Sequence, residues 1–144
     1  MVDENLFNLE RFIAAQSQTF TGALDELRAG EKHSHWMWFI FPQLRGLGRS
    51  PMAALFGIES LREAQAYLNH PVLGPRLILS TEAVLAVEGR TLHQIFGSPD
   101  DLKFRSSMTL FQRAAGGGET IFYQALNYYC DGKPDARTLS LLDW

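Results

Sequence analysis

The sequence predicts an all-α fold, an irregular single-domain bundle of about six to eight helices. Apolar residues recur at the spacing of amphipathic helices, and residues that begin or end helices separate the apolar stretches. No stretch alternates apolar and polar residues between hairpin turns, as a half-buried strand would. With 144 residues, 46% hydrophobic and 20% charged, the chain has the length and composition of one globular domain, so residues 1–144 are assigned to a single domain.

The chain opens with two predicted helices. The first has about three turns and one apolar face, which is formed by Leu6, Leu9, Phe12, Ile13 and Gln16. The second covers residues 21–29, with Leu24 and Leu27 facing inward. Arg28 lies in its last turn, where a cation is favourable, and Gly30 follows at the position that often ends a helix.

The stretch from Trp36 to Phe41 is apolar throughout, and the rest of the chain is organised around it. Its six residues are too few for a membrane span, which needs about 20. Pro42 disfavours a helical conformation of Phe41, so the segment ends there, as a short buried helical turn or a short buried strand. Residues 43–50 are different in kind, because they combine flexible glycines with two arginines. Residues 51–58 are predicted to form a turn or a short helix.

Start and stop signals delimit the next two helices. Ser60, with Glu63 three residues later, forms a capping box and begins a helix that ends at the His-Pro pair 70–71. The next helix covers residues 74–89, with Pro75 at the favoured first position.

The last third of the chain carries the same signals. Thr91 and Gln94 form a second capping box, for a short helix that ends at Gly97. Ser98 is the predicted N-cap of the following helix, with Pro99 at its first position. The remaining predicted elements are that helix with its apolar face through Phe104, Met108 and Phe111, a glycine break at 116–118, a helix near 120–129, and a docked apolar tail with Leu139, Leu141, Leu142 and Trp144.

Charge and composition exclude several classes. A net charge of −3 argues against broad electrostatic binding to nucleic acid or to an acidic membrane. The single cysteine, Cys130, fits a reducing compartment, and the N-terminus has no signal-peptide pattern, so we expect a cytoplasmic protein. The usual spacings of zinc, phosphate-loop, dinucleotide and hydrolase motifs are missing, so no metal and no cofactor are predicted.

Several unbroken blocks of the sequence resemble a bacterial family of unknown function, domain-of-unknown-function family eighteen-ten. The blocks are HWMWFIFPQ, GLGRSPMA, AYLNHPVLGPRL, IFGSPDDLK and SSMTLF. The resemblance spans roughly Phe7 to Leu142 and implies a small, mostly helical single-domain protein without an assigned reaction. Some members are mislabelled calpastatin, but an inhibitor segment of that type would be polar and disordered, whereas this chain is built to fold.

The first function hypothesis is a cleft for a small anionic or nucleotide-like ligand beside the aromatic run. Trp36 and Trp38 would stack on a ring, while arginine clamps an anion bidentately. The predicted ligand-binding residues are Trp36, Trp38, Gln43, Arg45, Arg49, Lys103 and Ser107. The loop 43–50 is expected to close over the cleft, opposite the helix that carries Lys103. His35 is the candidate acid or base, because histidine is the residue type that can donate or accept a proton near neutral pH.

The second hypothesis belongs to another class. The tryptophans and the tail from Leu141 to Trp144 would form a surface for a protein partner or a homodimer, with no catalytic activity. The aromatic run would then be core or interface. The sequence leaves both hypotheses open and does not decide whether the protein is an enzyme.

Overall fold

The computed structural model describes residues 7–143, and this part of the chain contains ten helices and no strands. In chain order they are α1 (Glu10–Gln16), α2 (Phe20–Arg28), α3 (Met37–Ile40), α4 (Pro51–Phe56), α5 (Leu61–Asn69), α6 (Leu73–Leu85), α7 (Leu92–Phe96), α8 (Asp100–Ala114), α9 (Ile121–Cys130) and α10 (Ala136–Leu142). The all-α prediction is confirmed. The number of helices exceeds the expectation because α3, α4 and α7 are short, with four, six and five residues.

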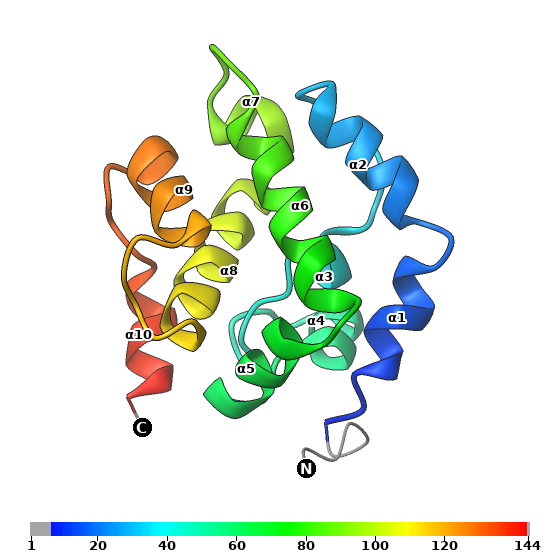
Figure 1. Cartoon of the computed structure of the whole chain (residues 1–144), viewed down its shortest axis with the longest axis vertical. Helices are drawn as coiled ribbons and strands as arrows, with labels where there is room; N and C mark the ends of the chain where they lie inside the picture. The colour runs from blue at the N-terminus through cyan, green and yellow to red at the C-terminus, as the bar shows by residue number, and fades with distance from the viewer. Residues whose placement is uncertain (1–6, 144) are drawn as a thin grey trace.

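The helices form an irregular bundle around α6 and α8. In Figure 1, α1 and α2 lie on one side of this pair and α9 and α10 on the other, while α3 lies near the middle and α4 and α5 lie towards the bottom of the view. Helix α8 packs against α5, α9, α7 and α10, so it connects the early and the late parts of the chain. No helix within residues 7–143 combines the length and the apolar character that crossing a membrane requires.

Aromatic rings fill the core in two groups. One group joins Trp36 and Phe41 of the aromatic run to Phe96 and Phe104, with the Phe41 and Phe104 ring centroids 5.0 Å apart. The second group connects Phe12, Tyr67, Phe111 and Phe122. Trp36, Phe39 and Ile40 are buried, as the sequence predicts for a core segment. The run forms the single helical turn α3, which Phe41 and Pro42 end.

Most helix boundaries agree with the start signals. Thr91 accepts a hydrogen bond from the backbone N–H of Gln94 and the Gln94 side chain accepts one in return, which is the predicted capping box. Ser60 caps α5 through the N–H of Glu63. The Glu63 carboxylate accepts the N–H of Glu59, and not the N–H of Ser60 that the predicted capping box requires.

Two boundary predictions are wrong. Ser98 does not cap α8: Pro99 occupies the N-cap position, and the carbonyls of Gly97 and Pro99 accept the first N–H groups of the helix. With those donors satisfied by the backbone, the Ser98 hydroxyl has no capping function. Pro75 is the third residue of α6, which begins earlier because the N–H of Gly74 already bonds to the carbonyl of His70.

The two ends of the chain are only partly described. Helix α1 begins at Glu10, so it is shorter than predicted, and Leu6 lies outside the described residues. The predicted tail forms α10, in which Leu139 and Leu142 are half-buried and Leu141 is exposed. Trp144 also lies outside the described residues.

A carboxylate fixes the chain just before the aromatic run. The half-buried Glu26 accepts hydrogen bonds from the backbone N–H groups of His33 (2.6 Å) and Ser34 (2.9 Å). It also accepts the Ser34 hydroxyl at 2.6 Å and the indole N–H of Trp36 at 3.1 Å. Both oxygens of Glu26 are therefore used to hold the loop that positions α3.

Candidate functional site

A cavity of about 390 Å³ opens between the loop after Pro42, the start of α8 and the start of α10. Its volume is in the range typical of pockets for small molecules. The residues that line it are Gln43, Leu47, Gly48, Pro99, Leu102, Lys103, Arg105, Ser106, Asp135 and Arg137. We call this cavity the cleft.

The cleft has a cationic side. Its lining includes three cations, Lys103, Arg105 and Arg137, but a single carboxylate, that of Asp135. Asp135 is committed to capping α10, because one of its oxygens accepts both the backbone N–H (2.9 Å) and the hydroxyl (2.6 Å) of Thr138. Positive charge therefore exceeds negative charge around the cleft, although the net charge of the whole protein is −3.

Two of the cations are held by the fold. The guanidinium of Arg105 donates to the carbonyls of Lys133 (2.8 Å) and Pro134 (3.3 Å), which ties α8 to the chain before α10. The Nζ of Lys103 lies 3.3 Å from the carboxylate of Asp100, and the same carboxylate forms an ion pair with Lys32 at 2.8 Å. Because two lysines share this one carboxylate, the charge of Lys103 is only partly compensated.

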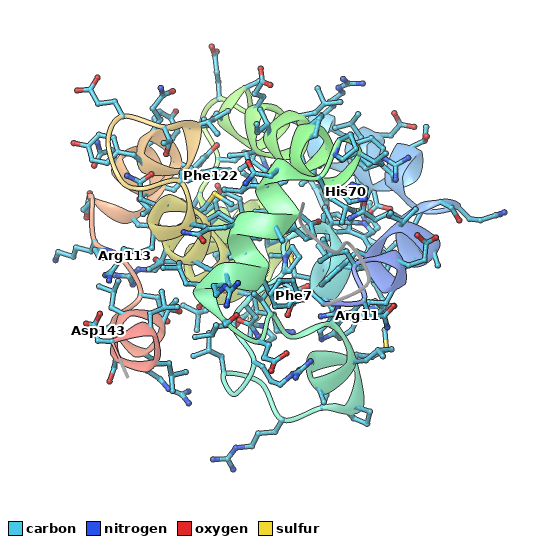
Figure 2. All side chains as sticks on the ribbon, turned by 60° about the horizontal axis from the view of Figure 1, so that its bottom comes forward. Phe7, Arg11, His70, Arg113, Phe122 and Asp143 are labelled. Carbon is cyan, nitrogen blue, oxygen red and sulfur yellow. The ribbon has the colours of Figure 1, made fainter. Side chains whose placement is uncertain are left out.

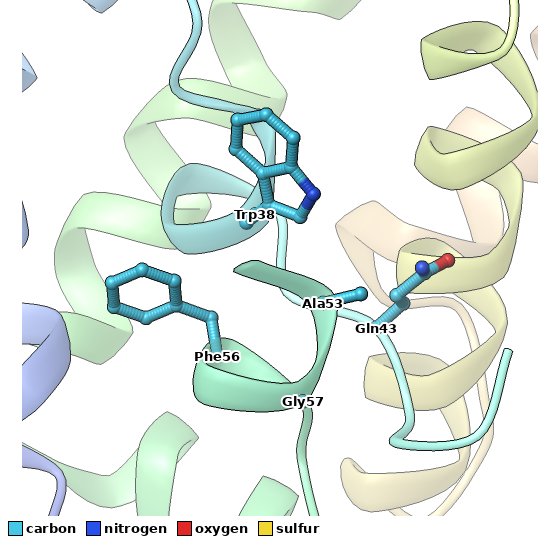
Figure 3. A pocket seen from close by; sticks show the side chains of 5 residues that line it. All are labelled: Trp38, Gln43, Ala53, Phe56 and Gly57. Carbon is cyan, nitrogen blue, oxygen red and sulfur yellow. The ribbon is translucent and has the colours of Figure 1, made fainter. Parts of the chain in front are cut away.

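The aromatic run contributes one ring to the neighbourhood of the cleft. The Nζ of Lys103 lies 5.0 Å from the ring centroid of Trp38, a cation–π distance. Trp38 is half-buried and lines a second, small cavity of about 10 Å³, together with Gln43, Ala53, Phe56 and Gly57. Figure 3 shows Trp38 on one side of this space and Gln43 on the other. Gln43 lines both cavities.

The loop carrying Gln43 is anchored by its backbone. An isolated parallel bridge joins Leu44 to Ile58: the N–H of Ile58 donates to the carbonyl of Gln43 (2.9 Å), and the N–H of Arg45 donates to the carbonyl of Ile58 (2.7 Å). Gly48 then packs against α4 so closely that a Cβ atom there would lie 2.7 Å from the Cβ of Ala53. The loop is thus held at two points, by the bridge at Leu44 and by the contact of Gly48 with α4.

The structure brings some of the predicted residues together and separates others. Gln43 and Lys103 line the cleft, and Trp38 lies beneath Lys103. Trp36 is fully buried and bonded to Glu26, so it has no free face on which a ligand could stack.

The predicted arginines do not line the cleft. Arg45 is exposed and donates to the carbonyl of Gly57 at 3.2 Å, and Arg49 is exposed as well. Arg45 precedes the turn at Gly46, where φ is +101°, and its guanidinium is held at the Gly57 carbonyl; after the turn, Leu47 and Gly48 line the cleft instead.

Ser107 and His35 also lie away from the cleft lining. Ser107 is fully buried, and its hydroxyl has no hydrogen-bond partner among the described residues. Its neighbour Ser106 lines the cleft, since adjacent helix positions point about 100° apart. His35 is exposed and is not among the lining residues.

Sequence reasoning missed part of the cleft. Pro99 and Leu102 recur at the three- and four-residue spacing of the helix face that carries Lys103 and Ser106, and that pattern could have added them to the site. Arg137 and Asp135 carry no comparable signal. They reach the cleft only because the chain after Cys130 folds back on α8, where the hydroxyl of Thr109 accepts the N–H of Asp135 at 2.8 Å.

Nucleophilic and metal chemistry find little support in residues 7–143. Burial raises the pKa of the Cys130 thiol, which disfavours the nucleophilic thiolate form. No three histidine, cysteine, aspartate or glutamate side chains in this range are placed to share a metal ion. The arrangement around the cleft is suited to binding, with cations, an amide and an apolar wall of Leu47, Pro99 and Leu102.

Comparisons with known proteins agree with the fold. A family model described as "Protein of unknown function (DUF1810)" matches residues 6–142. Among solved structures, the chain is similar to the conserved hypothetical protein Rv1873 from Mycobacterium tuberculosis, known from a crystal structure at 1.38 Å. The two are 54% identical, with a TM-score of 0.93, over 96% of this chain and 98% of the other. None of the curated proteins matches. The match over nearly the whole chain shows that this protein belongs to the DUF1810 family.

Proposed function

We propose that the protein binds a small anionic, nucleotide-like ligand in the cleft. The observation that carries the proposal is the excess of cations around a cavity of about 390 Å³: Lys103, Arg105 and Arg137 face a single carboxylate that already caps a helix. Charge-assisted hydrogen bonds from lysine and arginine are the usual means of holding phosphate and carboxylate groups.

The lining divides into two chemical halves, which supports a ligand of the same kind. Lys103 and Arg137 offer donors for an anionic group, while Leu47 and Leu102 offer apolar surface for an uncharged part. Because Arg105 already donates to two backbone carbonyls, its main contribution is to fix the position of the α10 side of the cleft. No catalytic step is proposed, since His35 lies away from this lining.

A thermal-shift titration with AMP, ribose 5-phosphate and inorganic phosphate tests the proposal. A ligand at 100 times its Kd stabilises the folded protein by about 2.7 kcal/mol. We expect Lys103→Met and Arg137→Ala to weaken binding at least tenfold. The control is Arg62→Ala, which removes an exposed cation of α5 that does not line the cleft. Equal binding by all variants, or no binding of any of the three compounds, contradicts the proposal.

A second candidate function is self-association. Exposed apolar side chains flank the cleft: Leu102 is 59% exposed and Leu141 of α10 is 39% exposed. Trp36 and Trp38 do not add to this surface, because Trp36 is buried and Trp38 is half-buried. Light scattering distinguishes the two candidates, since a homodimer through α10 would dissociate in a Leu141→Ser variant, whereas ligand binding needs no second copy.

A further inference from the structure

The indole N–H of Trp38 is a buried donor without a hydrogen-bond partner among the described residues. Buried donors are nearly always paired, because an unpaired one loses its hydrogen bonds to water and gains none in the protein. Trp36 shows the ordinary situation two residues earlier, where the indole N–H donates to Glu26. The Trp38 N–H therefore needs an acceptor that residues 7–143 do not supply.

The small cavity beside Trp38 has room for that acceptor. Its volume of about 10 Å³ corresponds to a single water molecule or a single ligand atom. In Figure 3 the indole nitrogen lies on the side of the ring that faces Gln43 and Ala53. Apart from Gln43, the side chains lining this space with Trp38 are apolar or absent: Ala53, Phe56 and Gly57.

Gln43 connects this small cavity to the cleft, because its side chain lines both. A primary amide carries two donor hydrogens and one acceptor oxygen, so it pairs with the donor–acceptor edge of a nucleobase. The backbone of Gln43 is fixed by the bridge to Ile58, and the Trp38 ring is held by Lys103. The two polar groups are thus presented from rigid positions at one end of the cleft.

We infer that Trp38 and Gln43 form a neutral subsite of the cleft that recognises the ring of a nucleoside monophosphate. A carbonyl oxygen or ring nitrogen of the base accepts the Trp38 N–H in the small cavity, and the Gln43 amide pairs with the neighbouring edge. The phosphate lies against Lys103 and Arg137. This inference rests on the proposed function and adds to it the class of the ligand and the residues that select it.

The indole signals of Trp38 and Trp36, two of the three tryptophans, provide a direct test. In a ¹H–¹⁵N correlation spectrum, we expect the Trp38 indole resonance to shift on titration with AMP or UMP and to stay unchanged with ribose 5-phosphate. The Trp36 indole is the internal control. Its N–H already donates to Glu26 and takes no part in the subsite, so its resonance should not respond. Assignment uses Trp38→Phe, which deletes one indole signal and keeps an aromatic ring under Lys103.

Affinity provides the second test. We expect Gln43→Met and Trp38→Phe each to weaken AMP binding about tenfold and to leave ribose 5-phosphate binding unchanged. Lys103→Met should weaken both compounds alike. If Trp38→Phe fails to fold, Gln43→Met and the spectrum of the wild-type protein still decide the question.

The results separate the two proposals. A Trp38 indole that stays still while backbone amides of the cleft respond to AMP overturns the subsite, and the small cavity then holds a structural water. An equal response to AMP and ribose 5-phosphate also overturns it, because the ring would add no recognition. If none of the phosphate compounds binds, the proposed function itself is wrong, and the subsite falls with it.

Discussion

At the scale of single residues, Arg11 shows how one side chain joins distant segments. Its guanidinium forms a 2.7 Å ion pair with Glu63, and both side chains are almost entirely buried, with 9% and 1% of their surface exposed. The same guanidinium also donates to four backbone carbonyls, those of Phe7, Asn8, Leu55 and Gly57. Figure 2 shows Arg11 beside Phe7. One arginine therefore connects α1 to α4 and α5.

Arg11→Met should destabilise the protein by about 3–5 kcal/mol, because it leaves the Glu63 carboxylate buried without its cation. The measurement is the free energy of unfolding in urea. Arg113→Met is the matched control, because its ion pair with Asp143 at 3.1 Å is exposed, with 44% and 64% of the two side chains accessible. We expect it to change stability by less than about 1 kcal/mol. Similar losses in both variants would show that Arg11 contributes no more than a surface arginine.

The carboxyl of Glu26 predicts a dependence of stability on pH. Burial alone would raise its pKa, but hydrogen bonds from Ser34, His33 and Trp36 outweigh this effect and lower the pKa from 4.5 to about 2. A group whose pKa is depressed on folding stabilises the native state above its unfolded pKa, and this contribution is lost as the pH falls towards the folded pKa. Stability should therefore decrease between about pH 4.5 and about pH 2.

The check is the free energy of unfolding of wild type and Glu26→Gln across that pH range. The variant lacks the titrating group, so its stability should fall less steeply with acid, although it starts lower at neutral pH. Parallel curves for the two proteins would mean that other carboxyls cause the acid sensitivity.

At the scale of the helices, two glycines near helix starts differ in how closely the rest of the protein packs against them. Gly74, near the start of α6, packs directly on the last turn of α5, where an added Cβ would lie 2.1 Å from the carbonyl oxygen of Leu68. Gly22, inside α2, is exposed and has nothing within 4 Å of such an atom. Only the first glycine is required by packing.

Gly74→Ala should cost about 1–3 kcal/mol or more, since α5 and α6 must separate to admit the methyl group. Gly22→Ala should stabilise the protein by up to about 1 kcal/mol, since alanine is the better helix former. Thermal unfolding of both variants measures the two effects. A tolerated Gly74→Ala would show that the α5–α6 contact adjusts, and a destabilising Gly22→Ala would point to a partner for that face of α2.

The helices also show what local sequence can and cannot predict. Thr91 and Ser60 were predicted as caps and act as caps, because the signal involves residues only three apart. Ser98 has the same local signal and does not cap, since carbonyls of Gly97 and Pro99 satisfy the first turn of α8. Competition between a side chain and the backbone for one donor cannot be decided from residue types alone.

At the scale of the whole molecule, the cleft was only partly predictable. The association of the loop after Pro42 with the helix carrying Lys103 followed from the chemistry of the residues, and a cavity lies between Gln43 and Lys103. Arg45 and Arg49 do not line the cleft: Arg45 donates to the carbonyl of Gly57, and the loop contributes Leu47 and Gly48 instead. Arg137 enters through a long-range contact, the return of the chain to α8, that no local pattern encodes.

The distribution of charge over the molecule predicts how salt affects the proposed binding. The net charge is −3, but the cleft lining carries three cations and one carboxylate, a local excess of two positive charges. An anion is therefore repelled by the molecule as a whole and attracted only near the cleft. The Debye length falls from about 10 Å at 0.1 M to about 3 Å at 1 M salt, so added salt weakens both effects. The cations of the cleft lie nearest to the anion, so the loss of their attraction is the larger change.

We expect the affinity for AMP to fall several-fold between about 0.05 M and about 0.5 M NaCl, and Lys103→Met to reduce this slope as well as the affinity. Isothermal titration at several salt concentrations measures both. Arg62→Ala, which changes the net charge by the same amount outside the cleft, should keep the wild-type slope. If Arg62→Ala and Lys103→Met alter the slope equally, the anion responds to the charge of the whole protein, and the cationic side of the cleft has no special role. If affinity does not change with salt, apolar contacts with Leu47 and Leu102 hold the ligand instead.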